Sequence, residues 1–187
     1  MSAALSDSVV ERARSGDTAA LTTIYIAVSP GILAYLRSHG SQDAEGLTQE
    51  VFAQLLPRIR RIKGGASGLR ALAFTIAHSR LVDEFRRRSR AVELPYEAEL
   101  DGRRVEPAER DALNNVHARD TAALVDSLSD DQRSVIMLRV FGDLSLEDTA
   151  HALGKSIGAV KQLQRRGLLA LRARLDEGID NLGTNHD

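Results

Sequence analysis

Hydrophobic residues recur with the period of an α-helix along most of the chain. Leu21, Ile24, Tyr25 and Val28 follow Asp17 at 3.6-residue spacing, and aspartate is a frequent N-cap residue. This pattern predicts an amphipathic helix that begins after Asp17.

Prolines and a glycine divide the next residues into further helices. Pro30 suits the first turn of a second helix, and Gly40 can end it. A third helix is expected from a cap at Ser41 to about Pro57, which should end or bend the helix. The apolar side of this third helix carries Ala44, Leu47, Val51, Phe52 and Leu55.

Glycines precede the longest helix of the N-terminal half. Residues 63–68 hold Gly64, Gly65 and Gly68, and this glycine content predicts a loop. A long helix is expected from Leu69 to about Ser89. Its apolar face carries Leu69, Leu72, Ala73, Ile76, Val82 and Phe85.

Composition changes at Ala91. Residues 91–111 hold seven acidic residues, three arginines and two prolines without a helical period, which predicts a flexible acidic linker. Fully extended, a segment of this length spans at most about 70 Å. Because two turns of B-DNA are about as long, a protein with this tether could hold two DNA sites at once.

A second helical cluster is expected over residues 114–175, and residues 178–187 are expected to fray. The cluster opens with Leu124, Leu128, Val135, Ile136, Leu138 and Val140. The fold class predicted from these patterns is all-α. It consists of two small helical domains joined by an acidic flexible linker, and the C-terminal domain is a helix-turn-helix.

The helix-turn-helix is predicted from residues 145–170. Ser145 can cap a short helix over residues 146–153, Gly154 supplies a sharp turn, and Ser156 can cap the second helix. The inward-facing residues are expected to be Ala150, Leu153, Ile157, Val160 and Leu163.

Basic charge is concentrated on the second of these helices. From Lys155 to Arg174 there are six basic residues and no acidic one, which suits contact with phosphates in a major groove. The candidate DNA-binding residues are Ser156, Ala159, Lys161, Gln162, Arg165 and Arg166. The alternative is a solvated basic helix, because Lys and Arg near a helix C-terminus are favoured by its dipole.

A second basic segment ends the helix of the N-terminal half. Arg80, Arg86, Arg87, Arg88 and Arg90 outnumber the acidic residues Asp83 and Glu84. Together with the glycines of residues 63–68, this segment could bind single-stranded DNA. A basic helix end in front of a linker explains the same charges equally well.

Composition excludes several other classes of protein. Apolar residues make up 43% of the chain and aromatic residues 4%, which favours a helical core of Leu, Ile, Val and Ala. No cysteine is present, so disulfides, thiol nucleophiles and cysteine-ligated zinc are excluded. No secretion signal and no membrane insertion are expected, and a cytoplasmic location follows as an expectation.

Candidate catalytic chemistry is lacking. The five histidines show no metal-ligand spacing, and the sequence has no P-loop, nucleophile elbow or His-Glu-x-x-His motif. The chain is therefore not expected to be an enzyme, and neither a cofactor nor a metal is expected.

Taken in order, several segments resemble those of the bacterial extracytoplasmic-function (ECF) sigma factors. The resemblance covers roughly residues 10–90 and 112–175. Residues 15–21 resemble the Gly-Asp-x-x-Ala segment that opens the promoter-melting domain, and residues 43–52 resemble the helix that binds core polymerase. Residues 74–88 resemble the helix that meets the −10 element. Residues 128–139 and 158–161 resemble the start and the recognition helix of the −35-binding domain.

This resemblance implies an alternative sigma factor that binds core RNA polymerase and promoter DNA, with an anti-sigma factor as a further partner. It implies a region-two-like domain over residues 1–90, a linker over 91–111, a region-four-like domain over 112–178 and a tail over 179–187. The implied polymerase-binding residues are Asp43, Leu47, Gln49, Glu50 and Phe52. The implied −10 residues are Lys63, Gly64, Gly65, Ser67, Ser79, Arg80, Asp83, Arg86, Arg87 and Arg88. The candidate residues of the recognition helix become the −35 contacts, and the linker would run toward the polymerase active-site channel.

The sequence departs from the common family pattern at three single positions and in one three-residue segment. Gly46 replaces a frequent Asp, Ser79 a frequent Asn, and Leu72 or Ala73 a frequent Trp. Residues 162–164 read Gln-Leu-Gln where Ser-Arg-Leu is commoner. These departures bear on the promoter sequence more than on the function.

Other functions compete with the sigma-factor interpretation. A helix-turn-helix regulator that acts without core polymerase would carry an N-terminal receiver or ligand domain, usually with strands, whereas residues 1–90 are predicted to be helical. A helical adaptor protein or a small helical enzyme are further alternatives. Regulation is expected from another protein or from the expression level.

Overall fold

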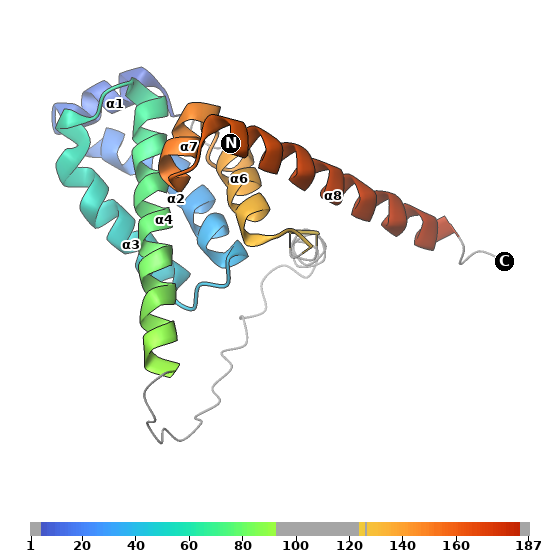
Figure 1. The fold of residues 1–187 in the computed structure, drawn as a ribbon. Helices are drawn as coiled ribbons and strands as arrows, with labels where there is room; N and C mark the ends of the chain where they lie inside the picture. The colour runs from blue at the N-terminus through green and yellow to red at the C-terminus, as the bar shows by residue number, and fades with distance from the viewer. Residues whose placement is uncertain (1–4, 93–123, 126, 184–187) are drawn as a thin grey trace.

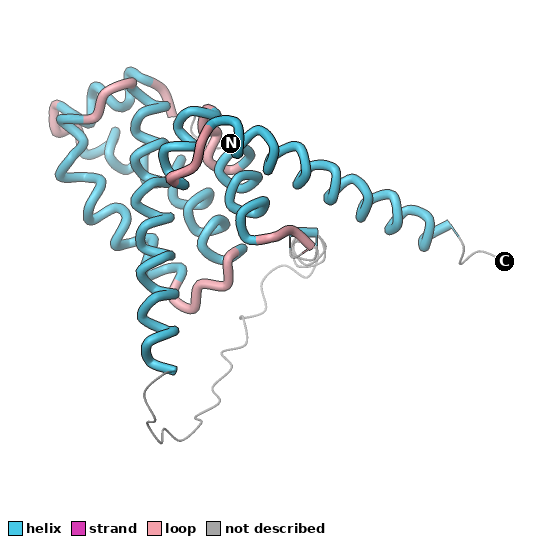
Figure 2. The backbone as a smooth tube through the Cα atoms, viewed as in Figure 1, coloured by secondary structure: helices cyan, strands magenta, loops and turns pink. Residues whose placement is uncertain are grey.

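The computed structural model describes residues 5–92, 124–125 and 127–183, and every regular element in these ranges is helical (Figures 1 and 2). The all-α prediction is therefore confirmed. In chain order the elements are α1 (Asp7–Arg14), α2 (Thr18–Ser38), α3 (Ala44–Leu55), the 3-10 helix η1 (Leu56–Arg61), α4 (Gly65–Val92), α6 (Asp130–Val140), α7 (Leu146–Leu153) and α8 (Ile157–Gly183).

Helix α2 is the central element, because it packs against α1, α3, α4 and α6. Its residues Ile24, Ile32, Tyr35 and Leu36 are completely buried. Each Å² of apolar surface that these side chains remove from water stabilises the fold by about 25 cal/mol. The helical pattern behind Asp17 therefore marks the centre of the core.

By length and composition alone, α2 is also apolar enough to cross a membrane, with a mean hydropathy of 1.6. A core helix of a globular protein passes the same test. One third of this apolar stretch, 33%, is buried against the neighbouring helices, and its buried side chains belong to the shared core.

The C-terminal helices pack on the N-terminal ones. Met137, Leu138, Leu144 and Ala152 are buried in the same hydrophobic cluster as the residues of α2, α3 and α4. A second, smaller cluster of Val135, Ala150 and Val160 holds α6, α7 and α8 together. The C-terminal part of α8 projects away from the rest of the molecule (Figure 1).

Most predicted helix ends are confirmed. The Asp17 carboxylate accepts the Ala19 and Ala20 amides at 2.9 and 3.2 Å, and the Ser145 hydroxyl accepts the Asp148 amide at 3.0 Å. Gly40 has a left-handed φ of 73° just after α2, and α3 gives way to η1 before Pro57.

Two predicted boundaries in the N-terminal half are wrong. Helix α2 runs through Pro30 without a break, although a new helix was expected there. Pro30 is exposed, so water can solvate the carbonyl group that loses its amide partner. Asp43 rather than Ser41 caps α3, because the Asp43 carboxylate accepts the Gly46 amide at 2.9 Å.

The predicted loop over residues 63–68 is also wrong in extent, because α4 begins at Gly65. The carboxylate of Asp7, from α1, accepts the Ala66 amide at 2.7 Å and so stabilises the start of α4. A Cβ atom at Gly68 would lie 1.8 Å from the Lys63 carbonyl oxygen. Glycine is thus required here by close backbone packing at a helix start.

The remaining differences lie at the ends of the two long helices. Helix α4 includes residues 91–92, which were assigned to the linker, and the other linker residues lie outside the described part of the chain. Helix α8 continues to Gly183, although fraying was expected from residue 178.

Candidate nucleic-acid and polymerase interfaces

The turn between α7 and α8 has the predicted geometry. Gly154 adopts a left-handed conformation with a φ of 61°, and the Lys155 amide donates to the Ala150 carbonyl at 2.9 Å. The Ser156 hydroxyl accepts the Ala159 amide at 3.1 Å. Glycine at the C-terminal end of one helix and serine at the N-terminal end of the next therefore fix the crossing of the two helices.

The first turns of α8 present an exposed polar surface. Of the predicted −35 residues, Ser156, Lys161, Gln162, Arg165 and Arg166 are exposed and Ala159 is half-buried. Val160 is fully buried, as predicted, whereas Ile157 is 40% exposed although an inward position was expected. The exposed side chains belong to two open hollows on neighbouring sides of the helix.

The first hollow is lined by small and polar side chains at the start of α8. Ser156, Ala159, Gln162 and Arg166 line it together with Lys155 and Asp131. The Lys155 ammonium forms a 2.9 Å ion pair with the Asp131 carboxylate. This pair links the turn to α6, and the sequence pattern did not single out Asp131.

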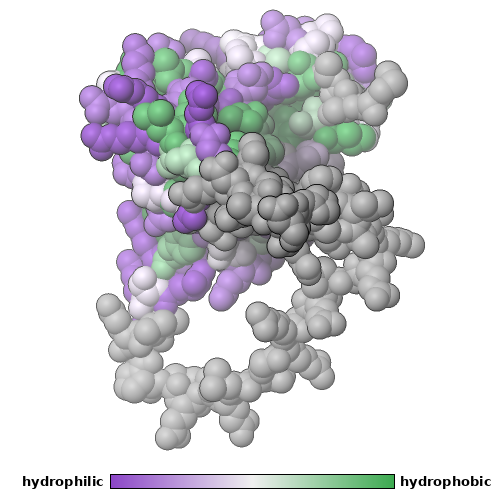
Figure 3. Space-filling model, turned by 90° about the vertical axis from the view of Figure 1, so that its right-hand side faces the viewer, coloured by the Kyte–Doolittle hydropathy of each residue, from purple (hydrophilic) through white to green (hydrophobic). Residues whose placement is uncertain are grey.

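The second hollow mixes basic and apolar groups. Lys161, Arg165 and Arg172 lie there beside Leu168 and Leu169, which are 48% and 57% exposed. Figure 3 shows hydrophobic and hydrophilic residues side by side on the part of this face that grey atoms do not cover. Arg165 and Lys161 therefore lie on a different side of α8 from Gln162 and Arg166.

A buried glycine sets how closely α8 crosses α6. Gly167 has little exposed surface, and a Cβ atom there would lie 3.0 Å from Ile136. The local sequence pattern does not mark Gly167, because a single glycine inside a helical pattern does not reveal a close helix crossing.

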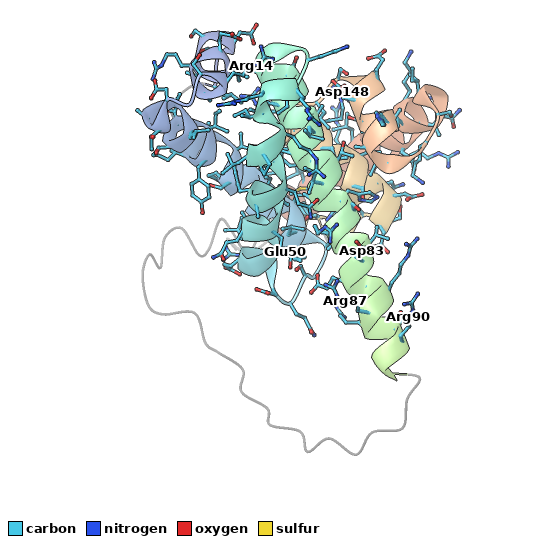
Figure 4. All side chains as sticks on the ribbon, turned by 90° about the vertical axis from the view of Figure 1, so that its left-hand side faces the viewer. Arg14, Glu50, Asp83, Arg87, Arg90 and Asp148 are labelled. Atoms are coloured by element: carbon cyan, nitrogen blue, oxygen red, sulfur yellow. The ribbon has the colours of Figure 1, made fainter. Side chains whose placement is uncertain are left out.

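The basic end of α4 is exposed. Arg86, Arg87, Arg88 and Arg90 are all exposed, and Figure 4 shows Arg87 and Arg90 near the free end of this helix. The Arg88 guanidinium lies 5.4 Å from the centroid of the Phe85 ring and donates to the Gly40 carbonyl at 3.3 Å. Arg88 therefore contributes to structure as well as to surface charge.

Other polar residues of α4 have partners within the protein. Arg80 lies 3.7 Å from the Asp83 carboxylate in an ion pair one helical turn apart. The neighbouring Glu84 is buried, with 8% of its surface exposed. Its carboxylate accepts a hydrogen bond from the Gln42 amide at 2.9 Å. Glu84 thus fastens the segment before α3 onto α4, a role that sequence reasoning missed. Ser79 is exposed.

The residues before and within the first turn of α4 lie at the opposite end of this helix from its exposed arginines. Lys63, Gly64 and Ser67 are exposed, and Gly65 is half-buried. A Cβ atom at Gly65 would collide with the Asp7 carboxylate. Gly64 and Gly65 therefore leave peptide groups accessible at the start of α4. The Asp7 carboxylate already accepts the Ala66 amide at this helix end.

The predicted polymerase-binding residues of α3 fall into two groups. Gln49, Glu50 and Asp43 are exposed, whereas Leu47 and Phe52 are buried with 3% and 5% of their surface accessible. Figure 4 shows Glu50 on α3, whose surface is separate from the free end of α4. The buried pair supports the helix from within, so only the exposed group can contact a partner directly.

Two residues of α2 extend the surface of α3. Tyr25 is 47% exposed, and its ring lies 4.7 Å from that of Phe52, while the neighbouring Ile26 is 52% exposed. The helical period had suggested an inward position for Tyr25. Its exposure leaves an apolar surface beside the polar residues of α3.

Two half-buried histidines, His39 and His78, lie between the N-terminal and C-terminal helices. Burial lowers the pKa of His39, and the nearby Arg133 guanidinium also lowers it. Burial likewise lowers the pKa of His78, with a further decrease from the Lys155 charge. Both side chains are therefore mainly neutral at pH 7. Among the described residues no cluster of ligands that could hold a metal ion is found.

Family models match both halves of the chain. The model described as Sigma-70 region 2 matches residues 25–91, and the model described as Sigma-70, region 4 matches residues 124–173.

Curated relatives give the same result. The chain is 33% identical over 172 residues to the ECF RNA polymerase sigma factor BldN of Streptomyces coelicolor, and the match covers 89% of this chain and 64% of BldN. It is 33% identical over 181 residues to the ECF RNA polymerase sigma factor ShbA of Streptomyces griseus, with 90% of this chain and 94% of ShbA covered. The chain thus spans slightly less than two thirds of BldN and nearly all of ShbA.

Solved structures share the fold. The sigma factor RpoE of Bartonella quintana, in complex with the anti-sigma factor NepR, has a TM-score of 0.64 at 25% identity, with 83% of this chain and 96% of that chain covered. CnrH, in complex with the cytosolic domain of CnrY, has a TM-score of 0.60 at 20% identity, with 91% and 97% covered. From its relatives and its two matched regions, the chain belongs to the ECF RNA polymerase sigma factors.

Proposed function

We propose that the protein is an alternative sigma factor that binds core RNA polymerase and directs it to promoters through two separate DNA surfaces. The family sets the class of function. The observation that carries the mechanism is the exposed basic side of α8, the second helix of the helix-turn-helix. The proposed domains are residues 1–90 and 112–178, joined by residues 91–111.

The −35 element is read by the N-terminal turns of α8. Such a helix places its first turns against base edges in the major groove, while flanking basic residues hold phosphates. Gln162 and Arg166, in the hollow beside Ser156 and Ala159, are suited to base edges. Lys161 and Arg165, on the neighbouring side, are suited to phosphates.

The −10 element is held as a single strand by the surface of α4. Its exposed arginines provide positive charge along one helix, which attracts a phosphate backbone. The peptide groups near Gly64 and Ser67 would receive an unpaired base, and extrusion of a base costs a few kcal/mol. The proposed set also includes Lys63, Gly65, Ser79, Arg80 and Asp83.

Core polymerase docks on the outer side of α3. Asp43, Gln49 and Glu50 provide polar contacts, and Tyr25 and Ile26 of α2 add an apolar surface beside them. Leu47 and Phe52 act from inside by fixing the position of α3. Because the Asp43 carboxylate is engaged in capping, its contribution to docking is coupled to the integrity of the helix end.

Two further statements belong to this proposal. The protein acts where RNA polymerase acts, in the cytoplasm, and it recognises DNA without performing catalysis itself. An anti-sigma factor is a proposed partner, because the structurally similar RpoE forms a complex with one.

The direct test is run-off transcription with purified core polymerase and a promoter library. The proposal predicts promoter-dependent transcripts that require the chain, together with its co-elution with core polymerase. Binding of the chain to duplex DNA of one sequence, without association with core and without transcripts, would support instead a helix-turn-helix regulator that acts alone.

A further inference from the structure

The N-terminal and C-terminal helices meet in a seam of specific polar contacts. Arg133 of α6 donates to the Ser38 carbonyl at 2.9 Å, and the Ser134 hydroxyl lies 2.9 Å from the Nε2 atom of His39. At another point Arg70 of α4 forms a 2.6 Å ion pair with Asp143. These contacts border the buried apolar residues of α6 and α7 that complete the N-terminal core.

The hydrogen bonds of His39 set the tautomer of its neutral ring, and burial lowers its pKa although the bond to the Tyr35 carbonyl raises it. Its Nδ1 atom lies 2.8 Å from the Tyr35 carbonyl oxygen, which can only accept, so this nitrogen carries a proton. In the neutral ring Nε2 is then an acceptor and receives the hydroxyl proton of Ser134. A second proton on the ring would create a charge at a position where Ser134 is only 7% exposed.

His78 lies in a matching position on α4. Its Nδ1 atom is 2.7 Å from the Tyr35 hydroxyl, whose pKa is raised by burial, so the hydroxyl keeps its proton and can donate it to the ring. Tyr35 is completely buried and contacts both histidines. One tyrosine therefore joins the two rings at the seam.

The charged groups that face the two rings come from the C-terminal helices. His39 faces Arg133 and Asp130 of α6, with His78 as a further neighbour. His78 faces Lys155, from the turn before α8, and Asp131 of α6. Asp131 is paired with Lys155 at 2.9 Å, which reduces its ability to stabilise a histidinium. The net effect at both rings, with desolvation as the largest cause, is a lowered pKa.

The closed seam conflicts with simultaneous binding of two promoter elements. The Lys155 charge acts on His78, so the start of α8 lies close to the part of α4 that carries Ser79 and Arg80. The −35 and −10 elements are about two turns of duplex apart, roughly 70 Å. A molecule that spans them must first separate α6, α7 and α8 from the N-terminal helices.

We propose that this seam is a proton-sensitive latch, in which neutral His39 and His78 hold the chain in a closed form and their protonation opens it. The effect on promoter binding rests on the proposed function, whereas the latch itself is a property of the chain alone. The open form exposes both rings to water and lets them take up protons with ordinary pKa values near 6.5.

The direction of the pH effect follows from linkage. Because the pKa of each histidine is lower in the closed form than in the open form, the ratio of closed to open form is highest above pH 6.5 and decreases as the pH falls. As the pH falls below 6.5 toward the lowered values, each histidine increases the open-to-closed ratio by up to about tenfold per pH unit.

The absence of cysteine in the chain allows a direct distance measurement. Thr22→Cys on α2 and Ala173→Cys on α8 place single thiols at exposed positions in the two halves, and a dye pair on them reports separation by energy transfer. We expect high transfer at about pH 8 and a fall between about pH 6.5 and 5. Circular dichroism should show unchanged helix content over this range.

Three variants make the test specific to the latch. The double change His39→Gln and His78→Gln removes both protonation sites and should abolish the fall, whereas His151→Gln changes an exposed histidine of α7 and should leave it intact. Ser134→Arg places a cation in the seam and should give the open signal at every pH. Constant transfer in the unaltered labelled chain, or a fall that persists in the double variant, would overturn the proposal. Neither result would affect the proposed function, because core polymerase and DNA are absent from the measurement.

Discussion

At the scale of single residues, the structure separates side chains that can contact a partner from those that support the fold. Arg165 and Lys161 are exposed on one side of α8, and Gln162 and Arg166 on the next. Their exposure was predictable from the sequence, because polar and basic residues recur there at helical spacing. It could not divide them between two sides, since this depends on where α6 covers α8.

Arg165→Ala should weaken promoter binding without changing sequence preference. Loss of one phosphate contact should reduce the dependence of log affinity on log salt concentration by about one unit. The measurement is holoenzyme affinity for one promoter at several salt concentrations. Arg12→Ala, which removes an exposed arginine of α1, is the matched control, and an equal decrease in slope for both variants would contradict the phosphate role.

Gly46→Ala should fail to give the stabilisation usual for this change inside a helix, about 1 kcal/mol. A Cβ atom at residue 46 would lie 2.2 Å from the Asp43 carboxylate, so the carboxylate must move and its capping bond is weakened. Gly46 stands where Asp is frequent in the family, and its lack of a side chain leaves room for the capping carboxylate of Asp43.

A double-mutant cycle isolates this effect. In an Asp43→Ala background no carboxylate opposes the new methyl group, so Gly46→Ala should raise the free energy of unfolding by about 0.5–1 kcal/mol. Denaturant unfolding of the four chains measures the coupling. Equal effects of Gly46→Ala in both backgrounds would show that the carboxylate and the methyl group do not compete.

At the scale of elements, helix existence was predictable from periodicity, but the ends of helices depended on distant partners. The caps at Asp17, Ser145 and Ser156 are local, because each side chain bonds an amide two or three residues ahead. The start of α4 is not local, because its partner Asp7 is 59 residues away. The glycines of residues 65–68, whose composition predicted a loop, therefore belong to the tightly packed first turn of α4.

Asp7→Ala should destabilise the start of α4. Loss of a helix cap costs about 0.5–2 kcal/mol, and the effect should be confined to the junction of α1 with α4. Hydrogen exchange at the Ala66 amide should accelerate, with thermal unfolding as the global measurement. Ser8→Ala, at an exposed position of α1, is the control. Unchanged exchange at Ala66 would show that the carboxylate is not the cap in solution.

At the scale of the whole molecule, the fold class was predictable and the packing of the two halves was not. The seam depends on pairs such as His39 with Ser134, which are 95 residues apart, and no local pattern marks them. The roles of Glu84 and Gly167 also depend on partners far along the chain, Gln42 and Ile136, and no local pattern marks them. The family resemblance identified which surfaces matter for function, whereas the structure shows that Leu47 and Phe52 of the implied polymerase-binding set are buried.

In the proposed function, one chain bound to core polymerase holds a duplex −35 element and a melted −10 element. The most direct measurement is a footprint of the reconstituted holoenzyme on a promoter selected from the library, with permanganate to detect unpaired thymines. The account predicts protection of the duplex at −35 and reactive thymines at −10, both dependent on core polymerase. A protected −35 element without unpaired thymines, or an identical footprint without core polymerase, would contradict it.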